Sequence, residues 1–325
     1  MSGTSVVPNA IEFKDRRLGC IVFGAVEIAM GCLCALMIPL LFFALAEAPP
    51  DAGLDYRTTG LGVAVYACLA VALVWLGIGS ILCRRWARVL LVVASWSWLL
   101  VGVLAMGAAA FAMQLSTRES ANPFAALILI VTEVFLAVFF VALPGAMALF
   151  YQSKHVKATC EARDPVVRWT DTCPLQVLAT SLWLGIGALA TLAVPVIYRS
   201  VVPLFGVLLS GAPATLMLLA FSAISLYLAW GTYRLKLSAW WTTVVATVLF
   251  GVSTAITFWK IDVLEIYRQM GYPEQQIAQM RSLGFHSSRS FALWIAVFSL
   301  LFLGYLLWVK KYFSQGGSTR QQSPA

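Results

Sequence analysis

Long apolar runs separated by short polar segments make up most of this 325-residue chain. There are eight such runs: Leu18–Ala46, Gly60–Cys83, Val89–Leu115, Pro123–Tyr151, Pro174–Tyr198, Pro213–Tyr233, Leu237–Trp259 and Phe291–Val309. A helix of about 20 residues crosses the hydrocarbon core of a bilayer. Because backbone polar groups find no water there, each run must form a helix or part of a closed barrel. The runs lack strict alternation, so the pattern predicts an all-α polytopic integral membrane protein with eight transmembrane helices.

The first run resembles a signal peptide in its flanks but not in its length. Lys14, Arg16 and Arg17 precede it, and small residues such as Ala46 and Ala48 lie at its end. The apolar region of a signal peptide is about 7–15 residues long, and this run is nearly twice that. We therefore expect an uncleaved membrane anchor.

Composition agrees with a membrane protein. The chain is 61% hydrophobic and 11% charged, whereas a soluble domain is roughly 45–50% apolar and about 25% charged. The solvating partner is therefore the lipid bilayer. The net charge of +8 is dispersed over short segments and not gathered on one face of a soluble domain, so we expect no nucleic-acid partner.

The distribution of basic residues predicts the orientation, because positively charged loops stay in the cytoplasm. With the N-terminus inside, fifteen Lys and Arg residues fall in inner segments: Lys14, Arg16, Arg17, Arg84, Arg85, Arg88, Lys154, Lys157, Arg163, Arg168, Arg234, Lys236, Lys310, Lys311 and Arg320. Seven fall in outer segments: Arg57, Arg118, Arg199, Lys260, Arg268, Arg281 and Arg289. Both termini are then cytoplasmic, in a pattern typical of a bacterial cytoplasmic (inner) membrane.

The polar interval 152–173 separates two similar halves. The segment Gly31–Pro39 matches Gly187–Pro195 at a shift of 156 residues, and the pairs Trp75/Trp230 and Trp86/Trp241 match at 155. We expect two parallel tandem four-helix repeats, as in some transporters. The expected divisions are a cytoplasmic segment 1–17, repeat 1 at 18–151, a cytoplasmic connector 152–173, repeat 2 at 174–313 and a disordered cytoplasmic tail 314–325.

Pro39 and Pro195 occupy matching places inside the first and fifth spans. Each removes a backbone hydrogen bond and is expected to kink its helix. The kinks either shape the packing alone or free carbonyls that line a cavity, as broken helices do in transporters.

Two outer segments have predicted structure of their own. The stretch Arg199–Ala212, interrupted by Pro203, is expected to lie along the outer interface or dip into it, or alternatively to lengthen the sixth helix, with Pro213 in its first turn. The loop 260–290 has two apolar stripes at helical spacing, separated by Gly271–Pro273. It predicts two short amphipathic helices that lie on the membrane surface, cap the bundle or dock a partner.

Two carboxyl groups, Glu27 and Glu133, lie deep in the first and fourth runs. Each is about 14–15 Å from the start of its helix, measured from opposite sides of the membrane. An acid at that depth must be protonated, paired or hydrated, so both are candidates for a proton or cation site. If they meet, they share a proton or a cation. If they do not, each is a neutral acid bonded to a neighbouring Ser, Thr or carbonyl group.

The remaining candidates for chemistry are weaker. His155 and His286 fall on opposite sides of the predicted membrane, and Cys160 and Cys173 lack the close pairing of a zinc ribbon. The sequence has no Gly-rich phosphate loop and no hydrolase or zinc-protease motif. We therefore expect no enzyme activity, no metal and no cofactor.

Two functions remain. The first is a structural, accessory or assembly component of a membrane complex, with a membrane-complex partner or a second copy of the chain. The second is a transporter or channel for a small solute or ion that uses a midplane cavity between the repeats. A transporter predicts a polar cavity near Glu27 and Glu133, and a scaffold predicts a packed centre.

Overall fold

The computed structural model describes residues 14–47, 56–116, 123–197, 199–282 and 288–319. Within these ranges, eight helices are long and apolar enough to cross a membrane, which is the property of an integral membrane protein. The sequence prediction of eight spans is thus confirmed. By contacts the chain divides into two compact units: Met1–Ala35, Ala67–Met106 and Ile128–Asp171 form the first, and Leu36–Tyr66, Gly107–Leu127 and Thr172–Ala325 form the second.

The first four spans are built from five helical segments: α1 (Arg17–Glu47), α2 (Tyr56–Ile81), α3 (Arg85–Ser116), α4 (Pro123–Ala137) and α5 (Leu143–Gln152). The π-helix η1 (Val138–Ala142) joins α4 to α5 within the fourth span. In the first unit, Gly24 on α1 and Gly77 on α2 let these two backbones touch: a Cβ added to either glycine would lie 2.7 Å from the carbonyl oxygen of the other. Small residues at such a crossing are typical of membrane helices.

The π-helix lies next to Pro144, a proline that did not enter the sequence prediction of helix kinks. Proline has no backbone N–H, so the carbonyl of Phe140 loses its usual helical donor. That carbonyl lies against Gly102 on α3, where an added Cβ would collide with it. A local π-turn and a glycine opposite it therefore accommodate the interruption, since π-turns and prolines are the usual causes of bends in helices.

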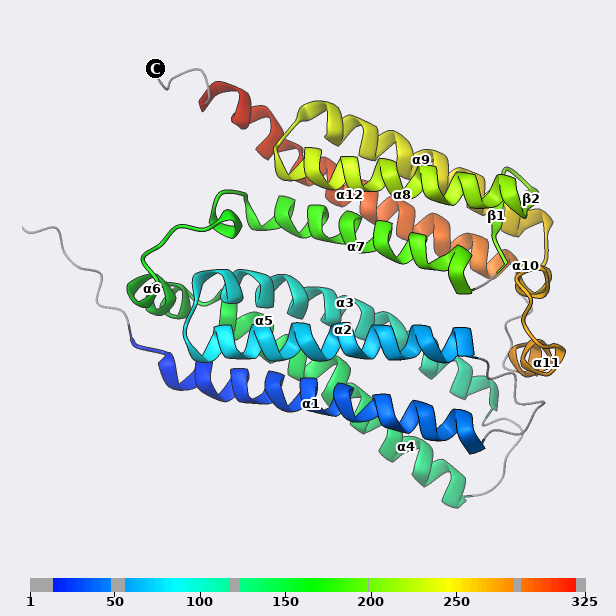
Figure 1. Ribbon diagram of the computed structural model, residues 1–325, viewed down its shortest axis with the longest axis horizontal. Helices are drawn as coiled ribbons and strands as arrows, with labels where there is room; N and C mark the ends of the chain where they lie inside the picture. The colour runs from blue at the N-terminus through cyan, green and yellow to red at the C-terminus, as the bar shows by residue number, and fades with distance from the viewer. Residues whose placement is uncertain (1–13, 48–55, 117–122, 198, 283–287, 320–325) are drawn as a thin grey trace, which may run out of the picture. The chain divides into compact units, whose positions relative to one another are not determined.

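The predicted connector is folded. It contains α6 (Lys154–Arg163) and the 3-10 helix η2 (Trp169–Asp171). Asp164 is only 2% exposed; its carboxylate accepts from the backbone N–H of Arg85 at 3.3 Å and lies 3.7 Å from Arg84 Nη1 and 3.6 Å from Arg168 Nε. The buried carboxylate thus ties the connector to the α2–α3 turn. Figure 1 shows α6 beside the beginning of α1, where the Arg16 N–H donates to Thr159 Oγ1 at 3.1 Å.

The second unit contains the last four spans: α7 (Leu175–Ile197), α8 (Ala212–Tyr233), α9 (Leu237–Lys260) and α12 (Ser288–Thr319). Within it, α7 packs on α8 and α9 packs on α12 (Figure 1). Ser181 and Ser222 help to join α7 and α8: Ser181 Oγ donates to the Ala229 carbonyl at 2.7 Å, and Ser222 Oγ donates to the Ala188 carbonyl at 2.9 Å. Helix α12 includes residues 314–319, part of the predicted disordered tail, and residues 320–325 lie outside the described chain.

The segment between α7 and α8 is a β-hairpin, which the sequence reading missed. Strand β1 (Val201–Leu204) pairs antiparallel with β2 (Val207–Ser210). The turn residues Phe205 and Gly206 have φ angles of 46° and 88°, as a two-residue type I′ turn requires. Their N–H groups donate to Ser253 Oγ and Thr257 Oγ1 on α9, each at 2.9 Å. The alternative that this stretch lengthens the sixth helix is wrong, because strand pairing and α9 satisfy its backbone. Pro213 does lie in the first turn of α8.

Two short helices occur where the loop 260–290 predicted them. They are α10 (Val263–Gln269) and α11 (Glu274–Ser282), separated at Gly271, whose φ is 90°. Asp262 caps α10 by accepting from the Leu264 N–H at 3.0 Å. Leu264 and Ile277 are buried together in a cluster that Phe258 of α9 also contacts. The apolar stripes therefore pack on each other and on the end of α9. Leu283 and residues 284–287 of this loop lie outside the described chain.

Because the Phe140 carbonyl lies against Gly102, Gly102→Ala should destabilise the protein by about 1–3 kcal/mol through overpacking. Gly145→Ala is the matched control, since the nearest atom to an added Cβ there, Leu99 Cδ1, is 4.0 Å away. We expect the control to be neutral or slightly stabilising. The measurement is the unfolding temperature of each purified variant in the same detergent. Equal temperatures for the two variants would contradict the close contact.

Candidate functional site

Glu27 lies on the buried face of α1. The buried residues of this helix are Cys20, Gly24, Glu27 and Gly31, which recur at helical spacing and form one stripe. Because Gly24 brings α1 against α2, the carboxyl group enters the helix interface, and Glu27 is 0% exposed. The stripe thus combines small residues that permit contact with one acid that must find partners.

Two hydroxyl groups connect Glu27 to neighbouring helices. Tyr151 Oη, from α5, is in hydrogen-bond contact with Glu27 Oε1 at 3.2 Å and with Ser80 Oγ of α2 at 2.6 Å. Ser80 Oγ donates in turn to the backbone carbonyl of Cys20 on α1 at 2.9 Å. Tyr151 and Ser80 are 1% and 3% exposed. Three helices of the first unit therefore meet in one buried polar chain.

Counting hydrogens indicates the form of the acid. The row of polar groups from Glu27 to the Cys20 carbonyl has three contacts, but the hydroxyl groups of Tyr151 and Ser80 carry only one hydrogen each. If Glu27 is protonated, its O–H donates to Tyr151, Tyr151 donates to Ser80, and Ser80 donates to Cys20. All three contacts are then hydrogen bonds. With an ionised carboxylate, one contact has no hydrogen, so the geometry fits the neutral acid.

The second oxygen of the carboxyl group is not used. Glu27 Oε2 is buried and has no hydrogen-bond partner among the described residues. Glu27 lies ten residues after Arg17, or about 15 Å along the helix. Burying an ionised, incompletely bonded carboxylate at that depth is expensive. A neutral acid lowers this cost, in agreement with the hydrogen count.

The second predicted acid does not join this chain. Glu133 lies on α4 and is partly exposed. In the described part of the structure, the hydrogen bond of the Glu27 carboxyl goes to Tyr151 and not to Glu133. The observed partners of Glu27 are thus a tyrosine and, through it, a serine. For Glu27 the contacts agree with the second alternative, an acid bonded to a neighbour, although that neighbour is a tyrosine; the role of Glu133 stays a prediction.

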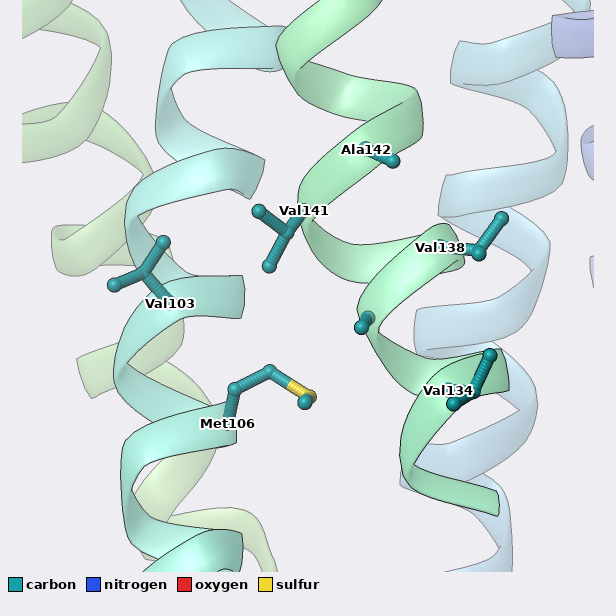
Figure 2. Close-up of a pocket in the computed structure, with 7 residues that line it drawn as sticks. Val103, Met106, Val134, Val138, Val141 and Ala142 are labelled. Carbon is teal, nitrogen blue, oxygen red and sulfur yellow. The ribbon is translucent and has the colours of Figure 1, made fainter. Parts of the chain in front are cut away.

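A hollow of about 450 Å³ lies in the first unit between α3 and the α4–η1 segment. Figure 2 shows Val103 and Met106 projecting from α3, with Val134, Val138, Val141 and Ala142 on the facing segment. Its lining includes neither Glu27 nor Glu133. An apolar hollow of this kind offers a solute or ion no polar ligands.

The other predicted positions are spread over several helices. Pro39 and Pro195 lie inside α1 and α7, and their kinks stay a prediction. Trp75 and Trp86 stack on each other with ring centroids 4.0 Å apart. Trp230 instead lies under Lys236, whose Nζ is 4.2 Å from the ring centroid, and Trp241 packs edge-on against Trp240. The four tryptophans therefore make different contacts in the two halves.

Sequence reasoning missed Tyr151 and Ser80. Tyr151 was read as the end of the fourth run, and Ser80 as an unremarked polar residue of the second. The available signal was position: Tyr151, Ser80 and Cys20 all lie near the predicted inner ends of their spans. Arg88 was missed for a similar reason. It was counted as an inner positive charge, whereas its Nη1 donates to the Tyr151 carbonyl at 3.2 Å.

Three cysteines also meet in the first unit. Cys20 of α1, Cys83 of the α2–α3 turn and Cys160 of α6 are buried, and their thiols interact. The hydrogen bond to Cys20 and burial raise the pKa of Cys83 well above its usual range. Burial alone raises the pKa of Cys173, in the connector, to about 11. A raised pKa makes the thiols of Cys83 and Cys173 poor nucleophiles. No group of residues that could hold a metal ion occurs in the described ranges.

Comparisons of the chain with protein-family models, with curated proteins and with solved structures gave no match. The function of the chain is therefore inferred from its own geometry.

If Glu27 is a neutral acid, Glu27→Gln should be tolerated, because the amide also donates to Tyr151. Tyr151→Phe removes the middle of the polar chain, so Glu27 loses its buried partner and Ser80 keeps only its bond to the Cys20 carbonyl, which costs about 1–3 kcal/mol. Tyr233→Phe is the control, since its hydrogen bond to Thr172 is exposed. The measurement is the unfolding temperature of each of the three variants in the same detergent. A Glu27→Gln variant as unstable as Tyr151→Phe would indicate an ionised carboxylate.

Proposed function

We propose that this protein is a structural or accessory component of a membrane complex, without catalytic activity of its own. The observation that carries the proposal is the enclosure of Glu27. Its carboxyl is fully buried between α1, α2 and α5, and its bonded oxygen serves a chain of contacts that ends on a backbone carbonyl. In this role the acid fixes how three helices pack, and buried polar groups can specify such an arrangement.

Purification tests the accessory role. The full chain with an affinity tag is solubilised in mild detergent, purified and separated by size. We expect membrane proteins to co-purify in a fixed ratio and to stay bound during size separation. Glu27→Gln, which keeps the packing, should retain them, and Tyr151→Phe should retain fewer. A particle that contains only this chain, at a mass of one or two copies, would contradict a complex with other proteins.

A second function has one specific observation in its favour. Oε2 of Glu27 has no partner within the described ranges, and the carboxyl and hydroxyl groups of Glu27, Tyr151 and Ser80 form a continuous row. Such rows of acids and hydroxyl groups move protons in pumps and transporters. The rival proposal is thus a proton-linked transporter in which Glu27 is loaded and unloaded.

Proton flux separates the two functions. The full chain is reconstituted in vesicles that contain a pH-sensitive dye, and a membrane potential is imposed. Transport predicts a flux that depends on the chain and falls at least tenfold in Glu27→Gln, which cannot release a proton. The accessory role predicts no flux above that of empty vesicles. Ser222→Ala is the control for a hydroxyl deletion elsewhere, since Ser222 Oγ donates to the Ala188 carbonyl in the second unit.

We further infer that the two halves are tandem four-helix repeats, and four pairs of contacts support this. In the first pair, Gly24 contacts Gly77 in the first half, and Ser181 contacts Ala229 in the second. In the second pair, Gly31 contacts Ala70 in the first half, and Ala188 contacts Ser222 in the second. In the third pair, the Phe150 ring lies over Gly19 in the first half, and Tyr305 bonds the Gln176 carbonyl in the second. In the fourth, Arg88 bonds the Tyr151 carbonyl in the first half, and Trp240 bonds the Leu306 carbonyl at 2.8 Å in the second.

All four pairs agree with one set of residue shifts. The shift is 157 for the first helix of each half, 152 for the second and third, and 155 for the last. The turns also correspond: Cys83 and Leu235 both have positive φ, and Gly79 and Gly231 both face an alanine methyl, of Ala87 or Ala239, at 2.6 Å. The first-helix shift differs by one from that of Pro39 and Pro195. The predicted tryptophan pairs are related by a shift of 155 residues, so the shift of 152 for the second and third helices does not align them.

The proposed topology has both termini in the cytoplasm of a bacterial inner membrane, supported by the excess of basic residues in inner segments. Fusions to alkaline phosphatase and to a fluorescent protein test it at two positions. A fusion at Lys236 should be fluorescent and lack phosphatase activity, and a fusion at Gly271 should behave in the opposite way. The reverse pattern would invert the topology.

A further inference from the structure

A second hollow, of about 370 Å³, opens where the α2–α3 turn meets the connector. It is lined by Trp75, Trp86, Val166, Val167, Arg168 and Trp169, all of which belong to the first unit. One wall is the stacked pair of Trp75 and Trp86, and the other is the connector segment after α6. The hollow therefore has an indole wall, two valine side chains and one guanidinium group.

The apolar part of this hollow is unusual for a polar connector. Val166 and Val167 are 58% and 65% exposed, and Trp169 is 47% exposed. These side chains lie beside Trp75, near the end of a span, where the bilayer interface begins. Exposed valine and tryptophan in that position would be costly in water and are favourable against lipid chains.

The charged part of the hollow has more cations than anions. Arg168 lines it, and the guanidinium groups of Arg168 and Arg84 both lie against one carboxylate, that of Asp164. Arg168 Nε is buried and has no hydrogen bond to the part of the chain that the structure describes; its distance of 3.6 Å from Asp164 Oδ2 is too long for one. Asp171, the other nearby acid, accepts from the backbone N–H of Arg168 at 3.0 Å. Two guanidinium groups thus share the single carboxylate of Asp164, which leaves one positive charge that this carboxylate does not neutralise.

We propose that this hollow binds an anionic glycerophospholipid, with its phosphate on Arg168 and its acyl chains along Trp75, Trp86 and the two valines. Arginine suits this role, because its planar fork donates two hydrogen bonds to a phosphate. The excess charge selects an anionic headgroup over a zwitterionic one. The apolar wall selects a lipid over free phosphate. The site is independent of whether the protein is an accessory component or a transporter.

Lipid titration tests the proposal. The full chain in mild detergent is titrated with dioleoyl phosphatidylglycerol or dioleoyl phosphatidylcholine, and bound lipids are counted by native mass spectrometry. One cationic side chain near a membrane surface changes lipid affinity about fivefold. We therefore expect the anionic lipid to bind at least fivefold more tightly, and Arg168→Gln to lose that preference. Glycerophosphoglycerol, the headgroup without acyl chains, should not compete.

Two variants separate binding from folding. Arg163→Gln is the matched control, because it removes a positive charge from the same connector, where Arg163 pairs with the exposed Asp15 at 3.2 Å, and it should keep the preference. Arg168→Lys keeps the charge and should retain most of the preference if the loss in Arg168→Gln is electrostatic. Equal binding of the two lipids by the natural chain, or an equal effect of Arg163→Gln and Arg168→Gln, would overturn the site. Competition by the free headgroup would overturn the lipid assignment in favour of an anion site.

Discussion

The backbone contact between Gly24 and Gly77 determines what the deep acid of this protein can reach. Helices that approach through glycines leave little space for side chains at the crossing. Glu27 is three residues further along the same face, so its carboxyl group enters the interface and cannot extend to lipid or water. Tyr151 and Ser80 then complete a polar chain whose every link crosses between helices. Close packing and polar bonding are thus two consequences of one contact.

The same need to satisfy backbone and polar groups explains the irregular parts of the fold. Pro144 frees the carbonyl of Phe140, and Gly102 on the neighbouring helix allows the chain to accommodate it. The hairpin turn at Phe205 and Gly206 gives its N–H groups to hydroxyls of α9. Asp164 is buried with two arginines and a backbone N–H. Each interruption of a helix therefore has a specific partner nearby.

The sequence predicted the spans well, because an apolar run of about 20 residues has few alternatives to a membrane helix. It also predicted α10 and α11 from their stripes and from Gly271. It did not predict the hairpin, since a short apolar segment interrupted by Pro203 does not reveal whether it pairs with itself. Nor did it reveal the partners of Glu27. Tyr151 is 124 residues away, and only the packing of α1, α2 and α5 brings the two side chains together.

In the proposed repeats, the two halves make corresponding contacts with different chemistry. At the shift of 157 that relates Gly24 to Ser181, Glu27 corresponds to Leu184, and at the shift of 155 Tyr151 corresponds to Leu306. In the second half a tryptophan bonds the Leu306 carbonyl, where an arginine bonds the Tyr151 carbonyl in the first. On the proposed alignment, the second half therefore packs a leucine where the first half buries an acid. Burying Glu27 costs free energy that burying the leucine does not. What the acid adds is a directional link between α1, α2 and α5, through Tyr151 and Ser80.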